Sequence, residues 1–250
     1  MINIFQLLLT DPLLNLLIFF YKLLFDNFGL AIVGLTLLLK IVTLPLTIPS
    51  LKMMAKQKDI AGELAALKNT YGKDKTLFAK KQMELYKAHG INPASGCLPQ
   101  ILQFVILIAL YQVFLAFLRH AESSASGMNS NLYFDFLKFS PEEKINTTFL
   151  YLNLAKPDPY YIMPVIAGAA QFVMSKLMMP KQVAKLEGAV VKETEEKKDD
   201  IMYNMQKQMM YMGPAMTVFL GAKFPSGLVF YWFLQTLFSV APQWILTKKK

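Results

Sequence analysis

The chain has 250 residues, a formal net charge of +9 at pH 7 and 54% hydrophobic residues. Several apolar runs of about 18–22 residues exclude an ordinary soluble domain and indicate an all-α membrane protein with several spans. A single cysteine excludes a disulfide framework and a cysteine-based metal site, and the two histidines have no partner at ligand spacing.

Residues 1–27 are apolar, but they lack the basic start and the small-residue cleavage site of a signal peptide. Thr10-Asp11-Pro12 predicts a helix start, after which only the 13 residues Leu13 to Phe25 are apolar. Because that stretch is too short to cross a bilayer, we expect an N-terminal interfacial amphipathic helix over residues 1–27. A further span that starts near Ile4 is the alternative.

Residues 28–48 form the first predicted span, since 21 residues at about 1.5 Å each reach roughly 30 Å, the thickness of the hydrocarbon core. Thr36, Lys40, Thr43 and Thr47 fall at i, i+4, i+7 and i+11, on one face of this helix. A polar stripe on an apolar span favours a water-filled groove beside Lys40. The alternative is that Lys40 extends to the nearer end of the span.

Residues 50–90 are basic, with nine lysines against four acidic residues, and they predict a helical hairpin outside the bilayer. Ser50 is expected to cap a helix that ends at Gly72, and Asp74 to cap a second helix that runs to Gly90. Such a lysine-rich segment is typical of the cytoplasmic side, where it fixes orientation, docks partners, or does both. The expected apolar faces are Ile60, Leu64, Leu67 and Tyr71 on the first helix and Ala79, Met83 and Tyr86 on the second.

Four more spans complete a five-helix core over residues 28–250, at about 97–118, 160–179, 208–223 and 226–246. Residues 119–159 form the predicted exterior segment, which carries an aromatic patch around Tyr133, Phe134 and Phe136, and residues 180–206 form a cytoplasmic loop. The predicted cytoplasmic segments, Lys176 and Lys207 included, hold 19 basic residues and the exterior ones hold five. This bias places the N-terminus outside and the C-terminus inside.

The spans contain no catalytic constellation, because they lack an acid pair, a Ser/His/Asp set and a glycine-rich phosphate loop. Every carboxylate lies outside them, which argues against an ion-coupled transporter as well as against an enzyme. We expect no cofactor and no metal. The spans do carry hydrogen-bonding side chains, which line a groove or only join helix to helix. They are Thr36, Lys40, Thr43, Gln103, Gln171, Ser175 and, at i, i+4, i+7 and i+11 of the last span, Trp232, Thr236, Ser239 and Gln243.

Three motifs between the spans resemble those of the YidC-type membrane protein insertases, bacterial relatives of the Oxa and Alb proteins. They are Asn92-Pro-Ala-Ser-Gly-Cys-Leu-Pro99, Asp158-Pro-Tyr-Tyr-Ile-Met-Pro164 and Phe224-Pro-Ser-Gly-Leu-Val-Phe-Tyr-Trp232, and they occur in the family's order over about residues 28–247. The resemblance is to the form without a large extracytoplasmic domain. It implies five transmembrane helices around a hydrophilic groove that is open to the cytoplasm and to lipid.

The resemblance also implies which residues meet a substrate. The family's groove arginine precedes a Pro-Leu-Thr stretch, and here Lys40 takes its place, which keeps the charge but not the two-pronged guanidinium. The family's aromatic pair matches Tyr231 and Trp232. The implied function is a bacterial plasma-membrane insertase and chaperone, without sequence-specific nucleic acid binding. Nascent membrane proteins and lipids are its implied partners, with the ribosome and the Sec translocon as further ones. A small channel or a lipid scramblase with a polar groove is the alternative, and a chaperone that only shields inserted helices is a third reading.

Overall fold

Long helices dominate the computed structural model, which describes residues 4–72, 74–92, 98–121, 125–178 and 201–248. The regular secondary structure of the described part is helical apart from one two-stranded hairpin. The α-helices are α1 (Asp11–Leu23), α2 (Phe28–Asp59), α3 (Ala61–Tyr71), α4 (Lys75–Ala88), α5 (Leu98–Ala121), α6 (Ile162–Met178), α9 (Ile201–Gly221) and α10 (Ser226–Lys248). The shorter elements are η1 (Gln6–Thr10), η3 (Ala125–Asn131), η4 (Asp135–Leu137), β1 (Thr148–Phe149) and β2 (Leu152–Asn153).

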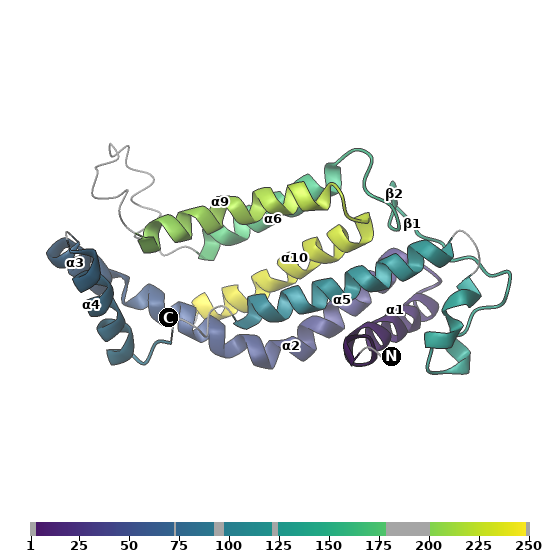
Figure 1. Cartoon of the computed structure of the whole chain (residues 1–250), viewed down its shortest axis with the longest axis horizontal. Helices are drawn as coiled ribbons and strands as arrows, with labels where there is room; N and C mark the ends of the chain where they lie inside the picture. Colours follow the sequence, from purple (N-terminus) through teal and green to yellow (C-terminus); the bar gives the residue numbers. More distant parts are fainter. Residues whose placement is uncertain (1–3, 73, 93–97, 122–124, 179–200, 249–250) are drawn as a thin grey trace.

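The helices α2, α5, α6, α9 and α10 run along the long axis of the molecule (Figure 1). The α3–α4 hairpin lies at one end of this bundle, and the β1–β2 hairpin lies at the other. Within the bundle, α6 packs against α9 and α10, and α10 also packs against α2. The N-terminal α1 packs on α2 and α5. This order puts α10 between the two halves of the bundle.

Two described helical stretches, Gln6–Leu23 and Phe28–Gln57, are long and apolar enough to cross a membrane by length and composition. Shorter apolar helices cover Ile101–Ala116, Ile162–Leu177 and Ser226–Val240. A helical membrane protein therefore fits the described structure, while the number of five spans stays a prediction. Helices α5, α6 and α10 lie where the second, third and fifth spans were predicted.

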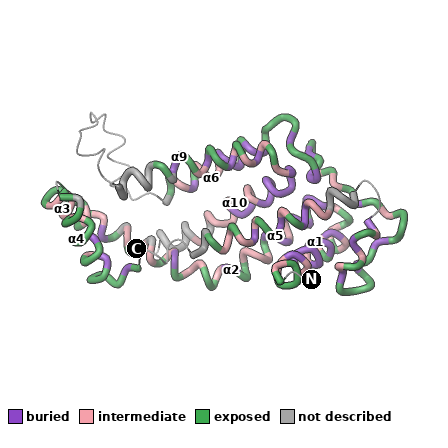
Figure 2. The backbone as a smooth tube through the Cα atoms, viewed as in Figure 1, coloured by how far each residue is buried: buried purple, intermediate pink, exposed green. Residues whose placement is uncertain are grey.

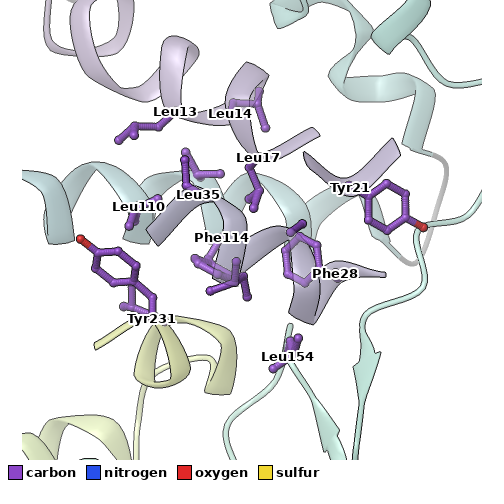
Figure 3. Close-up of a cluster of buried hydrophobic side chains, with 14 of the residues drawn as sticks. Leu13, Leu14, Leu17, Tyr21, Phe28, Leu35, Leu110, Phe114, Leu154 and Tyr231 are labelled. Atoms are coloured by element: carbon purple, nitrogen blue, oxygen red, sulfur yellow. The ribbon is translucent and has the colours of Figure 1, made fainter. Parts of the chain in front are cut away.

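The main core joins α1, α2, α5 and α10 at the end of the bundle that carries the β hairpin (Figures 2 and 3). On α1 the buried side chains recur every three to four residues, so one complete face of this helix is covered. They meet Phe28 and Leu35 of α2 and Phe114 of α5 (Figure 3). The N-terminal helix is therefore an integral part of the bundle. The buried apolar and aromatic side chains of α1 are Leu13, Leu14, Leu17, Ile18 and Tyr21.

The prediction that a helix starts at Thr10-Asp11-Pro12 is only partly correct, because α1 begins at Asp11 with Pro12 in its first turn, but this point is not the start of the helical segment. The π-helical turn η1 precedes α1 without a break, and Thr10 itself has helical backbone angles and makes no capping bond. Its hydroxyl donates instead to the Gln112 side chain on α5, at 3.2 Å. A cap signal in sequence cannot anticipate such a tertiary partner. Whether residues 1–27 lie on the membrane or cross it stays a prediction.

The prediction of a new helix at Ser50 is also wrong. Helix α2 continues through Pro45 and Pro49 to Asp59, and Ser50 is a buried residue inside it. Proline removes one backbone donor, which leaves the backbone oxygens of Ile41 and Pro45 without their helix partners. The Thr43 and Thr47 hydroxyls donate to other backbone oxygens of this segment, those of Leu39 and Leu44. The basic hairpin therefore begins with α3, about ten residues later than predicted.

The hairpin itself is confirmed as α3 and α4. Asp74 caps α4, because its carboxylate accepts a 3.0 Å hydrogen bond from the Leu77 amide, as predicted. The two helices share a small apolar cluster of their own, formed by Ile60, Tyr86 and Ile91. The predicted apolar face of α4 is only partly correct, because Tyr86 is buried whereas Met83 is exposed.

The remaining difference in secondary structure concerns the predicted loop 180–206. Helix α9 begins at Ile201, so the last six residues of that loop are helical, and residues 179–200 lie outside the described residues.

The predicted exterior segment contains η3, η4 and the β hairpin, none of which was anticipated. Each is short, so it leaves no periodic pattern in the sequence.

Asp158, in the second motif, organises the start of α6. Its buried carboxylate accepts hydrogen bonds from the Met163 amide at 2.7 Å, the Tyr160 amide at 3.0 Å and the Tyr151 hydroxyl at 3.1 Å. Burial and the bond to this carboxylate raise the pKa of Tyr151 above its ordinary value. Asp158 thus fixes where the chain leaves the exterior segment and enters the bundle.

The Phe-Pro-Ser-Gly turn, in the third motif, joins α10 to the same segment. The Ser226 hydroxyl donates to the backbone oxygen of Asn153 at 2.7 Å, and the Gly227 amide donates to that of Leu154 at 2.9 Å. A Cβ at Gly227 would lie 2.8 Å from the Leu154 oxygen and would also meet the Phe114 ring. Only glycine lets the start of α10 approach the backbone at Leu154 so closely.

We therefore expect Gly227→Ala to destabilise the folded protein by about 1–3 kcal/mol, the usual cost of forcing an extra methyl group into a packed site. The measurement is thermal unfolding of the purified protein in detergent. Gly213→Ala is the control, because the nearest atom there is the end of the flexible Gln171 side chain at 3.3 Å. Equal melting temperatures for the two variants would contradict this explanation.

Candidate functional site

Lys40 lies near the middle of α2 with its side chain half-buried. Its ammonium donates a 2.5 Å hydrogen bond to the Ser239 hydroxyl on α10, and that hydroxyl donates to the backbone oxygen of Gln235 at 2.7 Å. Among the described residues, no carboxylate forms an ion pair with this ammonium. Neutral oxygens of a neighbouring helix therefore hold the cation. An ammonium has three donors, so this bond leaves two for other acceptors.

The threonines of the predicted polar stripe behave differently from Lys40. Thr36 is fully buried and Thr43 nearly so. Their hydroxyls donate to backbone oxygens one turn earlier in α2, those of Ile32 at 2.6 Å and Leu39 at 2.7 Å. Their donors are thus used within the helix, and Lys40 is the member of the stripe that reaches a second helix.

A second polar group links α5 to α10. The Gln103 side chain donates to the Tyr231 hydroxyl at 3.3 Å and accepts from the Gln235 amide at 2.8 Å. Tyr231 is almost fully buried, with 1% of its surface exposed, and its hydroxyl points away from the apolar core cluster (Figure 3). Together with Lys40 and Ser239, these three residues form a set that we name the α10 ladder.

Gln235 is the ladder residue that the sequence reasoning missed. It is 7% exposed, and its side-chain oxygen has no hydrogen-bond partner among the described residues. If the side-chain amides of Gln103 and Gln235 were both flipped, so that oxygen and nitrogen exchange places, the hydrogen bonds among Gln103, Gln235 and Tyr231 would be kept. The Gln235 nitrogen would then lack a partner in place of its oxygen. One buried polar atom of the ladder therefore stays without a described partner in either arrangement.

The face of α10 explains why Gln235 was missed. The sequence reasoning grouped Trp232, Thr236, Ser239 and Gln243, whereas the ladder uses Tyr231, Gln235 and Ser239 at i, i+4 and i+8. Trp232 and Thr236 are half-buried on the adjoining face, where the Thr236 hydroxyl donates to the Trp232 backbone oxygen at 3.0 Å. The side chain of Gln243 lies outside the described residues. The spacing of four residues between Tyr231, Gln235 and Ser239 was the available signal.

Gln171 belongs to a separate contact. Its side-chain oxygen accepts a hydrogen bond from the fully buried Thr217 hydroxyl, which joins α6 to α9. Ser175 lies one turn further along α6 and is half-buried. The predicted site residues thus fall into two groups, one on α2, α5 and α10 and one on α6 and α9.

Similarity to known proteins decides the family. The family model described as 60Kd inner membrane protein matches residues 19–250. The chain belongs to this family. The resemblance predicted from the three motifs is thereby confirmed.

Three relatives in this family are each named membrane protein insertase YidC. The protein of Fusobacterium nucleatum is 34% identical over 223 residues, which cover 89% of this chain and 87% of that protein. Those of Cellvibrio japonicus and Vesicomyosocius okutanii are 32% and 35% identical over 243 residues, covering 96% and 97% of this chain. The chain spans only 36% and 37% of the length of these two relatives.

Binding of a metal ion would require a suitable group of side chains among the described residues. These residues include no group of three or more His, Cys, Asp or Glu residues that could hold a metal ion.

If the Gln103–Gln235 bond couples α5 to α10, the effects of Gln103→Leu and Gln235→Leu on stability should not add. We expect a coupling energy of about 0.6 kcal/mol or more, as for other hydrogen bonds between membrane helices. The measurement is a double-mutant cycle on thermal unfolding in detergent. Additive effects would show that the two amides do not interact. Thr236→Val combined with Gln103→Leu is the control pair and should be additive.

Proposed function

We propose that the chain is a membrane protein insertase and chaperone of the bacterial plasma membrane. It receives nascent membrane proteins in a hydrophilic groove beside the α10 ladder and releases their apolar segments sideways into lipid. The proposal includes five spans with the N-terminus outside and the C-terminus in the cytoplasm. It is supported by the names of the three relatives and by the positive-inside bias of the loops.

The observation that carries the proposal is the Lys40 ammonium. A charge in the middle of an apolar helix costs roughly 2.5–3.5 kcal/mol on insertion scales and is rarely kept without a function. A hydroxyl holds this ammonium, and no described carboxylate neutralises it. It is therefore suited to attract a transient anionic partner, such as an acidic residue in the polar flank of an incoming chain.

The mechanism follows from the cost of moving a polar flank through hydrocarbon. A hydrated groove on the cytoplasmic side shortens the apolar distance that the flank must cross. Lys40 attracts the flank, while the apolar segment that follows partitions into lipid and supplies the driving force. No nucleotide hydrolysis is needed for these steps. Thr36 and Thr43 then support the helix backbone next to Lys40.

The aromatic pair takes unequal parts in this mechanism. Trp232 is half-buried, so part of its ring can contact a passing segment directly. Tyr231 is covered and bonded to Gln103, so it becomes available only when α10 and α5 separate. The unpaired amide atom of Gln235 provides a hydrogen-bonding position for water or for the backbone of the incoming chain.

The α3–α4 hairpin is proposed as the cytoplasmic docking surface. It has its own small core and carries most of the lysines of the segment 50–90 on helices that are largely exposed (Figure 2). Such a surface suits anionic lipid headgroups and acidic partners. We propose the ribosome and the Sec translocon as further partners that dock there. Gln171 and Ser175 are proposed to line the α6–α9 side of the route.

A small channel or a lipid scramblase would also use polar groups between helices. It would not need the basic hairpin, and the names of the relatives favour insertion. Ion flux or lipid exchange in vesicles that contain only this protein, without a substrate, would support the alternative.

The charge of Lys40 gives the direct test. In reconstituted vesicles, Lys40→Arg should insert a substrate with an acidic translocated tail as well as the original protein does. Lys40→Glu should lower that insertion at least about fivefold, which corresponds to roughly 1 kcal/mol of lost attraction. Protease protection of the translocated tail measures the effect.

Lys52→Glu is the matched control, because it makes the same charge change on an exposed position of the same helix. A substrate whose tail lacks acidic residues is the second control. Full insertion of the acidic-tailed substrate by Lys40→Glu would refute the role of the charge. Equal losses with Lys52→Glu would assign the effect to overall charge.

A further inference from the structure

A pocket of about 350 Å³ lies away from the α10 ladder, between η1, the start of α1, the second half of α5 and η3. Its polar wall consists of Gln6, Thr10, Asp11, Gln112 and Asn131. The other lining residues are apolar or glycine, as in many sites that bind small amphipathic molecules. The wall includes both ends of the π-helical turn η1, a type of turn that is frequent at functional sites.

Asp11 is the charged group of this pocket. Its Oδ1 accepts from the Asn131 amide at 3.2 Å and from the Gln6 amide at 3.5 Å. Both bonds fall on one oxygen, so within the described residues Oδ2 keeps its capacity to accept. No lysine or arginine is among the lining residues. Burial and the Asp11 carboxylate raise the pKa of Tyr133, which lies two residues after the lining residue Asn131.

The depth of the pocket indicates where its ligand comes from. Gln112 and Ala116 lie nine and five residues before the end of α5 at Ala121, which is roughly 8–14 Å along the helix at 1.5 Å per residue. With α5 across the bilayer and Ala121 outside, this is the depth of the headgroups and upper acyl chains of the outer leaflet. A carboxylate at that depth is stabilised by a cation from the same layer.

We propose that the pocket binds the primary ammonium headgroup of an outer-leaflet phospholipid, phosphatidylethanolamine, with Asp11 as the ion-pair partner. A primary ammonium has three donors for Oδ2 and for the amide and hydroxyl oxygens of the wall. A choline headgroup has none and prefers an aromatic cage, and the lining residues include no aromatic side chain. A phosphatidylglycerol headgroup has no cation to meet Asp11. The proposal uses the membrane orientation given above but not the insertion mechanism.

The test is native mass spectrometry of the full-length protein in detergent with phosphatidylethanolamine, phosphatidylcholine and phosphatidylglycerol of identical acyl chains. The original protein should retain phosphatidylethanolamine about fivefold better than the other two, the effect expected of one partly exposed ion pair. Asp11→Asn should abolish the preference. Asp26→Asn is the matched control, because Asp26 is an exposed acidic residue at the other end of α1, and it should keep the preference.

Ala116→Phe, which fills the pocket from α5 without altering the carboxylate, is a second variant and should also abolish the preference. Equal retention of the three lipids, or an unchanged preference in Asp11→Asn, would overturn the proposal. Displacement of phosphatidylethanolamine by free ethanolamine or by a short lysine peptide at the same concentration would assign the pocket to a soluble amine or a polypeptide and also overturn it. Lys40→Glu should keep the lipid preference, so failure here and failure of the insertase mechanism are distinguishable.

Discussion

The structure depends on one constraint, the free-energy cost of placing a charged ammonium within an apolar helix. The Lys40 ammonium lowers this cost by donating a hydrogen bond to the Ser239 hydroxyl on α10, which itself donates to the backbone of α10. Because the partner is neutral, the positive charge is held in place but not cancelled. Helix α10 packs against both α2 and α6, and the ladder joins it to α2 and α5.

The two ends of the bundle serve this arrangement differently. At one end Asp158 and the Ser226-Gly227 turn fasten α6 and α10 to the exterior segment, and the large core of α1, α2, α5 and α10 lies next to them. At the other end the α3–α4 hairpin has only its own small cluster. The end that carries the β hairpin is therefore held by the main core, whereas the α3–α4 hairpin is stabilised mainly by its own cluster.

Sequence reasoning located the helices well where one physical rule dominates. Apolar length placed α5, α6 and α10, and the Asp74 cap placed α4. It failed where a tertiary contact overrides a local signal. Ser50 was predicted to cap a new helix but lies inside the continuous α2, and Thr10 bonds Gln112 across the bundle instead of capping a helix. On α10 the polar face was placed one residue too far along, because the face of α10 that meets Gln103 of α5 is set by tertiary packing, which buries Tyr231 and Gln235.

The most direct test of a hydrated groove beside Lys40 is to measure whether water reaches position 40 from the cytoplasmic side. With Cys97 replaced by serine, Lys40→Cys should react with a charged, membrane-impermeant maleimide added to inverted vesicles. Ile41→Cys should not react, because Ile41 is an exposed apolar residue of the same helix that would face lipid. Reaction at position 41 with none at position 40 would contradict a hydrated groove beside Lys40.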